Sequence, residues 1–173
     1  MNTKKVYQSI TKIVESYKAK LANQSEEEFT LTPPIGGWSY SEVYSHIFDA
    51  SLLSLMALNN CIKGEGENKP THFAVKIILF LGSFPPNKKY KVPTRLMERV
   101  KKIKLIAAQQ LIIDFEIQMA KTLPQIAHTN AKIKTKHPRL GYLNAKQWFK
   151  FIEIHLHHHL KQLNRIENSL AKP

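Results

Sequence analysis

Four of the eight histidines in this chain lie within five residues, in the stretch FIEIHLHHHLKQL at 151–163. His155 and His159 are four residues apart, so in a helix their imidazoles lie one above the other on the same face. That spacing lets two ring nitrogens bind one divalent metal ion. The cluster is internal and interrupted, unlike a purification tag. Two ligands hold a metal weakly, so we expect a third from a neighbouring helix.

A long helix predicted over 145–171 indicates which of these histidines point inward. At about 100° per residue, an apolar stripe runs along one side of this helix and includes His155 and His159. His158 lies at the edge of the stripe, and His157 lies on the opposite side. The cluster is therefore a mixture of two inward-facing rings, one borderline ring and one exposed ring.

A second predicted helix, over 38–62, offers the third ligand. Ser39 and Glu42 have the spacing of a capping box, which places the start of the helix near Ser39. His46 lies on the apolar face of this helix, where alanines allow a close helix neighbour. A buried histidine can instead simply bond a carbonyl group. The residue pattern leaves open both a metal site formed by His46, His155 and His159 and a set of core histidines.

Polar and aromatic residues border the same faces. Asp49 is a candidate general base, although a carboxylate beside a histidine more often orients its second N–H. Gln162, one turn beyond His159, could bond a metal-bound water or a substrate, or satisfy a buried polar neighbour. We therefore name Asp49 and Gln162 as the candidate catalytic residues. Three aromatic residues, Trp38, Trp148 and Phe151, could line an apolar pocket or fill the core.

The remaining pattern predicts an all-α four-helix bundle with long connections and one short extra helix. Apolar periodicity marks long helices over 6–21, 38–62, 105–122 and 145–171, with Pro124 just beyond the third and Asn144 as the cap of the fourth. Residues 71–83 are apolar enough for a short buried helix, although a strand is possible. The prolines of 84–94 predict a loop, and polar connections are expected over 22–37 and 127–143.

Length and charge restrict the class of protein. A chain of 173 residues suits a single domain over 1–173, and one cysteine cannot form an intramolecular disulfide. The net charge is +13, and its densest basic run is 87–104. No nucleic-acid-binding motif accompanies that run, so we expect a solvated lysine surface and no nucleic-acid partner. The most apolar stretch, 73–84, is too short to span a bilayer. We expect a cytoplasmic protein with no membrane partner.

Two blocks of the sequence resemble the DinB-like, or YfiT-like, superfamily. The first is WSYSEVYSHIFDA at 38–50, a tryptophan-serine start to a helix with a histidine about one and a half turns later. The second is KHPRLGYLNAKQWFKFIEIHLHHHLKQL at 136–163. Its residues that match the family pattern are His137, Pro138, Gly141, Leu143, Trp148, His155, His158, His159 and Gln162. The stretch 71–104 matches no motif of the family.

The resemblance implies a four-helix bundle of DinB/YfiT type, often a homodimer, that binds a divalent metal, zinc or nickel. Carried over by position, the ligands are His46, His155 and His159. It implies a metal-dependent hydrolase or a thiol S-transferase acting on a small-molecule substrate, the latter with a low-molecular-weight thiol cofactor. No distinct thiol-binding motif is present. The alternative is a non-catalytic helical protein whose basic surface binds an acidic partner or nucleic acid.

Overall fold

The computed structural model describes residues 2–85 and 98–170. Four long helices form a bundle, as predicted, but two short helices and a two-stranded hairpin accompany them. The elements are α1 (Thr3–Ala22), α2 (Glu26–Thr30), α3 (Tyr40–Ile62), α4 (Phe73–Leu81), α6 (Leu105–Ile126), β1 (Lys134–His137), β2 (Gly141–Asn144) and α7 (Ala145–Leu170). In the described residues, no helix is long and apolar enough to cross a membrane.

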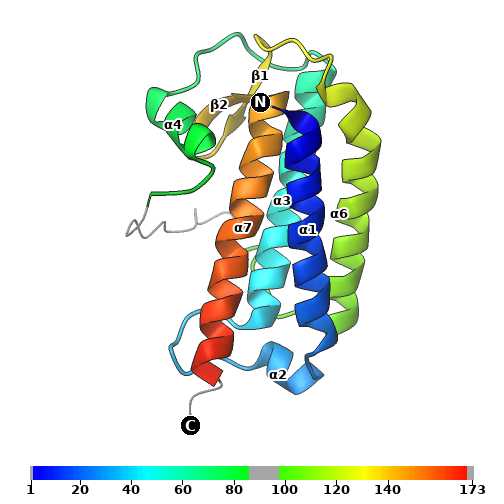
Figure 1. Ribbon diagram of the computed structural model, residues 1–173, viewed down its shortest axis with the longest axis vertical. Helices are drawn as coiled ribbons and strands as arrows, with labels where there is room; N and C mark the ends of the chain where they lie inside the picture. The colour runs from blue at the N-terminus through cyan, green and yellow to red at the C-terminus, as the bar shows by residue number, and fades with distance from the viewer. Residues whose placement is uncertain (1, 86–97, 171–173) are drawn as a thin grey trace.

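The four long helices do not simply alternate in direction. In Figure 1, α1 and α7 run down the page, whereas α3 and α6 both run up it. Helix α3 lies between α6 and α7, and α1 packs against those same two helices on the other side. Because α3 and α6 are parallel, the connection from one to the other must return along the whole bundle. The neighbours α3 and α7 are antiparallel, and they carry the candidate ligands.

The centre of the bundle is aromatic. Phe48 is fully buried, and its ring lies 5.2 Å from that of Tyr17 and 6.0 Å from that of Phe115, both edge to face. Each buried tyrosine hydroxyl has a backbone partner: Tyr17 donates to Leu156 O at 2.8 Å, and Tyr44 donates to Tyr17 O at 2.7 Å. These bonds connect α1, α3 and α7, so the polar tips of the rings are satisfied within the core.

Side-chain caps set the starts of the two helices that carry histidines. Ser39 accepts from the backbone N–H of Glu42 at 3.3 Å, and Glu42 accepts from that of Ser39 at 2.9 Å, which is the predicted capping box. Asn144 accepts from the backbone N–H of Gln147 at 2.9 Å, and the Gln147 side chain accepts in return at 3.0 Å. The predicted start of α3 and the predicted cap of α7 are both confirmed.

Two predictions were wrong, one about the end of a helix and one about a connection. Helix α6 continues to Ile126 and contains Pro124, whose missing N–H removes one hydrogen bond of the helical ladder, and the helix ends two residues later. The connection over 22–37 contains α2, which has its own capping box between Ser25 and Glu28. Helix α2 buries Phe29 completely, and the Glu26 carboxylate accepts from the backbone N–H of Leu105 at 3.1 Å, at the start of α6.

The connection predicted over 127–143 contains the β1–β2 hairpin. The described residues are therefore mostly, but not entirely, helical. The Thr135 hydroxyl of the hairpin accepts from the Trp148 indole at 2.8 Å and donates to Ala57 O at 3.0 Å, so the hairpin holds α7 against α3. Gly141 has a φ of +74°, and a Cβ there would lie 2.7 Å from the His72 ring. A side chain at this position would be strained and would also clash.

The short helix expected over 71–83 forms as α4, but it is not buried as predicted. Only Val75 of this helix is buried. Much of the predicted loop at 84–94 and of the basic run at 87–104 lies outside the described residues.

Candidate metal centre

Three histidines from two helices converge at one point, between α3 and α7. One ring nitrogen from each of His46, His155 and His159 lies within 4.8 Å of the others. The ring centroids are 4.9 Å apart for His46 and His159, and 5.3 Å for His46 and His155. His46 and His159 are buried, and His155 is partly buried. The structure therefore brings together the three residues that the sequence singled out.

The donor spacing suits a small divalent ion. The Nε2 atoms of His155 and His159 are 3.1 Å apart. Two nitrogens that each lie about 2.0–2.1 Å from a tetrahedral zinc ion are roughly 3.3 Å apart. Three imidazoles are also a donor set that catalytic zinc sites use, with a further position left open for a small molecule. The His155–His159 spacing therefore suits a zinc-like or nickel-like ion, with a nitrogen of His46 within 4.8 Å of both.

Gln162 determines which nitrogen of His159 is available. The Nδ1 of His159 lies 2.8 Å from Gln162 Oε1, which can only accept, so Nδ1 carries the proton and donates. The unprotonated Nε2 then faces the other two rings. By contrast, His155 Nδ1 is buried and has no hydrogen-bond partner among the described residues. Leaving a buried nitrogen without a hydrogen bond costs folding free energy. Such unsatisfied groups are expected at functional sites more than in a structural core.

Burial keeps the cluster neutral. It lowers the pKa of His46 to about 4, and outweighs the opposing effect of the Asp49 charge. Burial, together with the neighbouring histidines, also lowers the pKa values of His155 and His159 well below the usual range. All three imidazoles are therefore neutral at neutral pH, each with one ring N–H and one nitrogen that can bind a metal. Neutral imidazole is the form that binds metal ions, so no proton has to be removed first.

Aromatic rings enclose the cluster on two sides. Trp38 stacks on His159, with ring centroids 6.3 Å apart and planes 13° apart, and lies 5.0 Å from His46. Phe151 stacks on His155 at 5.2 Å and 22°. Trp148 instead packs edge to face on Phe151. Trp38 and Phe151 therefore form walls of the site, whereas Trp148 supports one of those walls.

The other two histidines of the cluster lie where the helical phase placed them. His157 is exposed, and His158 is partly buried, with its ring 5.3 Å from that of Phe84. His137 of the family pattern lies on the hairpin, where its Nδ1 accepts from the backbone N–H groups of Arg139 and Leu140 at 3.1 and 3.0 Å. Burial lowers the pKa of His137 to about 4. This ring holds the hairpin turn.

Asp49 lies one turn from His46 but is engaged elsewhere. Both of its carboxylate oxygens accept from the Arg99 guanidinium, at 2.7 and 2.6 Å. Glu42, the other acidic residue on this face, is occupied by the capping box. No local signal in the sequence marks Arg99 as a neighbour of the site, because it lies 50 residues from Asp49 in the chain.

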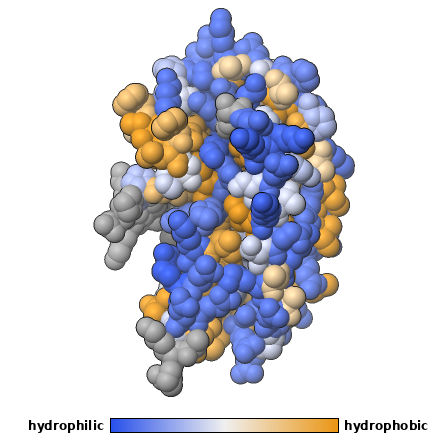
Figure 2. Space-filling view, viewed as in Figure 1, coloured by the Kyte–Doolittle hydropathy of each residue, from blue (hydrophilic) through white to orange (hydrophobic). Residues whose placement is uncertain are grey.

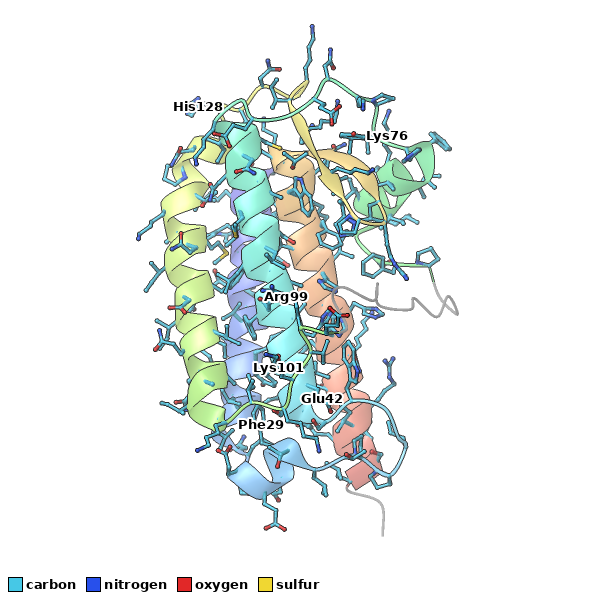
Figure 3. The ribbon with its side chains drawn as sticks, turned by 180° about the vertical axis from the view of Figure 1, so that it is seen from behind. Phe29, Glu42, Lys76, Arg99, Lys101 and His128 are labelled. Carbon is cyan, nitrogen blue, oxygen red and sulfur yellow. The ribbon has the colours of Figure 1, made fainter. Side chains whose placement is uncertain are left out.

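Arg99 lies in a turn at the start of a segment, 98–104, that contains no helix or strand and lies along α3. Figure 3 shows Arg99 and Lys101 where this segment crosses in front of the helix. The Ser41 hydroxyl donates to Ile103 O at 2.7 Å, and the Ser45 hydroxyl accepts from the backbone N–H of Lys101 at 3.3 Å. Steps of four helical residues advance about 6 Å, and steps of two extended residues advance about 6.6 Å. Ser41, Ser45 and Asp49 follow one another at steps of four residues on α3. Their partners Ile103, Lys101 and Arg99 follow one another at steps of two residues, so the three contacts repeat at nearly the same interval.

Comparisons with known proteins agree with this fold. The DinB superfamily matches residues 14–163 of the chain. Among solved structures, the four-helix bundle protein TT2238 is 13% identical, with a TM-score of 0.62 over 95% of this chain and 99% of that chain. YfiT from Bacillus subtilis is 14% identical, with a TM-score of 0.58 over 99% of this chain and 89% of that chain. No curated protein matches the chain by sequence.

Proposed function

This chain belongs to the DinB superfamily, and on that premise we propose that it is a metal-dependent hydrolase whose divalent ion is held by His46, His155 and His159. The observation that supports this most directly is the convergence of three neutral imidazole nitrogens within 4.8 Å, from helices that meet only through tertiary packing. Zinc and nickel are the ions that we expect. The structural neighbour YfiT is described as a probable metal-dependent hydrolase, which favours hydrolysis over thiol S-transfer.

Each residue of the site would have a distinct role. His46, His155 and His159 hold the ion, and Gln162 holds the proton of His159 at Nδ1 so that Nε2 can bind. Trp38 and Phe151 exclude bulk water from the two sides of the cluster that they cover. When bound, the ion supplies Lewis acidity and lowers the pKa of a water or thiol, so that a nucleophile is available near neutral pH.

Asp49 has a positioning role in this proposal. Its two oxygens are both hydrogen-bonded to Arg99, so the carboxylate orients Arg99 and the segment 98–104 beside the site. Its charge also raises the pKa of its neighbour His46, but burial outweighs this effect.

Metal removal and restoration test the function. Untagged protein is expected to contain close to one equivalent of zinc or nickel by elemental analysis, and to hydrolyse a simple activated ester such as p-nitrophenyl acetate. Prolonged dialysis against a chelator should abolish hydrolysis, and stoichiometric zinc or nickel should restore it, because the ion supplies the nucleophile.

Two other results would contradict this proposal. A folded protein that carries no divalent ion and takes up neither zinc nor nickel would end the metal proposal. Activity that depends on an added low-molecular-weight thiol and transfers that thiol to an alkyl or aryl halide would instead identify an S-transferase built on the same three ligands.

Gln162→Leu is expected to lower zinc affinity by about 10- to 100-fold, because the hydrogen bond that fixes the His159 tautomer is lost. Affinity is measured by competition with a chromophoric chelator. Gln162→Glu keeps an acceptor at the same distance and should recover most of the affinity. Gln118→Leu, on the exposed surface of α6, is the matched control and should bind zinc normally. Unchanged affinity in Gln162→Leu would show that the bond does not tune the site.

A further inference from the structure

Helix α4 has two apolar faces, of which the fold uses only one. Val75 is buried, and Leu79 packs against the core. The opposite side carries Phe73, Ile77 and Phe80, which lie within about 60° of one another around the helix axis. Their exposed fractions are 77%, 43% and 89%. Figure 2 shows the resulting apolar patch at the end of the molecule where α4 lies.

Among the described residues, no packing against the bundle accounts for this outer face. Because α4 is anchored through Val75 and Leu79, polar residues at the outer positions would leave those inner contacts intact. Leu81, at the end of the helix, is 65% exposed and extends the patch. Scattered exposed apolar residues are ordinary, but two phenylalanines and two aliphatic residues side by side on one short helix indicate a surface that another apolar phase covers.

The surroundings of α4 are basic. Lys76, labelled on α4 in Figure 3, is exposed beside the patch. The hairpin adjoins α4, since the His72 ring packs against Gly141 and Thr71 pairs with that same glycine. Lys136 and Arg139 are exposed on this hairpin.

Two acidic residues near this end are already paired. Glu67 forms an ion pair with Lys69, and Glu153 forms one with Lys150. The α4 patch is thus an apolar centre with an excess of cationic groups around it, in a chain of net charge +13.

We propose that α4 docks this protein on an anionic lipid surface, with Phe73, Ile77, Phe80 and Leu81 entering the headgroup–acyl boundary and the neighbouring cations contacting anionic headgroups. A bilayer interface offers both an apolar phase and negative charge at the same place. A second copy of this chain would bring like charges together, and nucleic acid offers no apolar phase for the two phenylalanines. Interfacial docking needs no spanning helix, so it is compatible with the short apolar run at 73–84.

Vesicle co-sedimentation of the full chain tests the proposal. The unsubstituted protein is expected to bind vesicles that contain about 30% phosphatidylglycerol in phosphatidylcholine, more tightly than pure phosphatidylcholine vesicles. Raising the salt from about 50 mM to about 500 mM should weaken this binding. Phe73→Ser/Phe80→Ser should reduce the partition coefficient about tenfold or more.

The matched control is Ile113→Ser/Ile117→Ser, which removes two exposed apolar residues of α6 (46% and 45% exposed) and should leave vesicle binding unchanged. Circular dichroism and zinc uptake of both double variants should equal those of the unsubstituted protein, which separates this test from that of the metal centre.

Three results would overturn the proposal. The first is no binding to anionic vesicles at low salt. The second is binding that survives Phe73→Ser/Phe80→Ser, or that the α6 control weakens equally. The third is a self-associated protein, by sedimentation velocity, that the α4 variant converts to monomer without any vesicle binding. That result would assign the face to a second copy.

Discussion

His155→Ala is expected to abolish tight metal binding, with a loss of zinc affinity greater than about 100-fold. This loss exceeds the one expected when a residue that only hydrogen-bonds a metal ligand is changed. Only His46 and His159 would remain as ligands, and two imidazoles hold a divalent ion weakly. The fold should survive, because alanine favours the helix and the substitution removes a buried nitrogen that has no partner. Zinc titration with a competing chelator measures the affinity, and circular dichroism measures the helix content.

The matched control for this variant is His157→Ala, which removes an exposed imidazole two residues away on the same helix. It should bind zinc with full affinity. Tight zinc binding by His155→Ala would show that the three-histidine cluster is not the metal site. Equal losses in both variants would point to non-specific binding by the histidine-rich helix.

Phe48→Ala is expected to lower the free energy of unfolding by about 3–5 kcal/mol. The ring is fully buried among Tyr17, Tyr44 and Phe115, so its removal leaves a cavity where α1, α3 and α6 meet. Urea unfolding of the metal-free proteins, followed by circular dichroism, measures the change without a contribution from ligand binding.

The same substitution at an exposed phenylalanine provides the control. Phe80→Ala, at 89% exposure, should change the free energy of unfolding by no more than about 0.5 kcal/mol. A loss of several kcal/mol at Phe80 would mean that the outer face of α4 serves folding, and it would remove the reason to look for a docking surface there. A small loss at Phe48 would contradict the packing of the core.

Local rules predicted the helices because each signal lies within a few residues. Ser39 and Glu42 mark the start of α3, and Asn144 caps α7, since a cap depends only on the first turn of its helix. The β1–β2 hairpin has no comparable signal, because its strands are four residues long and mostly polar. Its stability comes from distant partners, such as Glu67, which pairs with Lys134.

Helix α4 shows where hydrophobicity alone fails. A run of eight apolar residues interrupted by Lys76 predicts that something apolar covers it, but not which face lies inward. Val75 is buried and Phe80 is exposed, although both are apolar and lie on the same short helix. Only the packing of α4 against the bundle distinguishes them.

Helical periodicity was enough to predict which side of each helix is apolar, and therefore that His155 and His159 face inward while His157 does not. It also placed His46 on an inward face. Whether these faces meet was decided by the tertiary structure, because His46 and His155 are more than a hundred residues apart in the chain and their separation depends on how α3 packs against α7. The same holds for Arg99 and Asp49. Helical periodicity is a property of a few turns, whereas a coordination distance between helices is a property of the whole core.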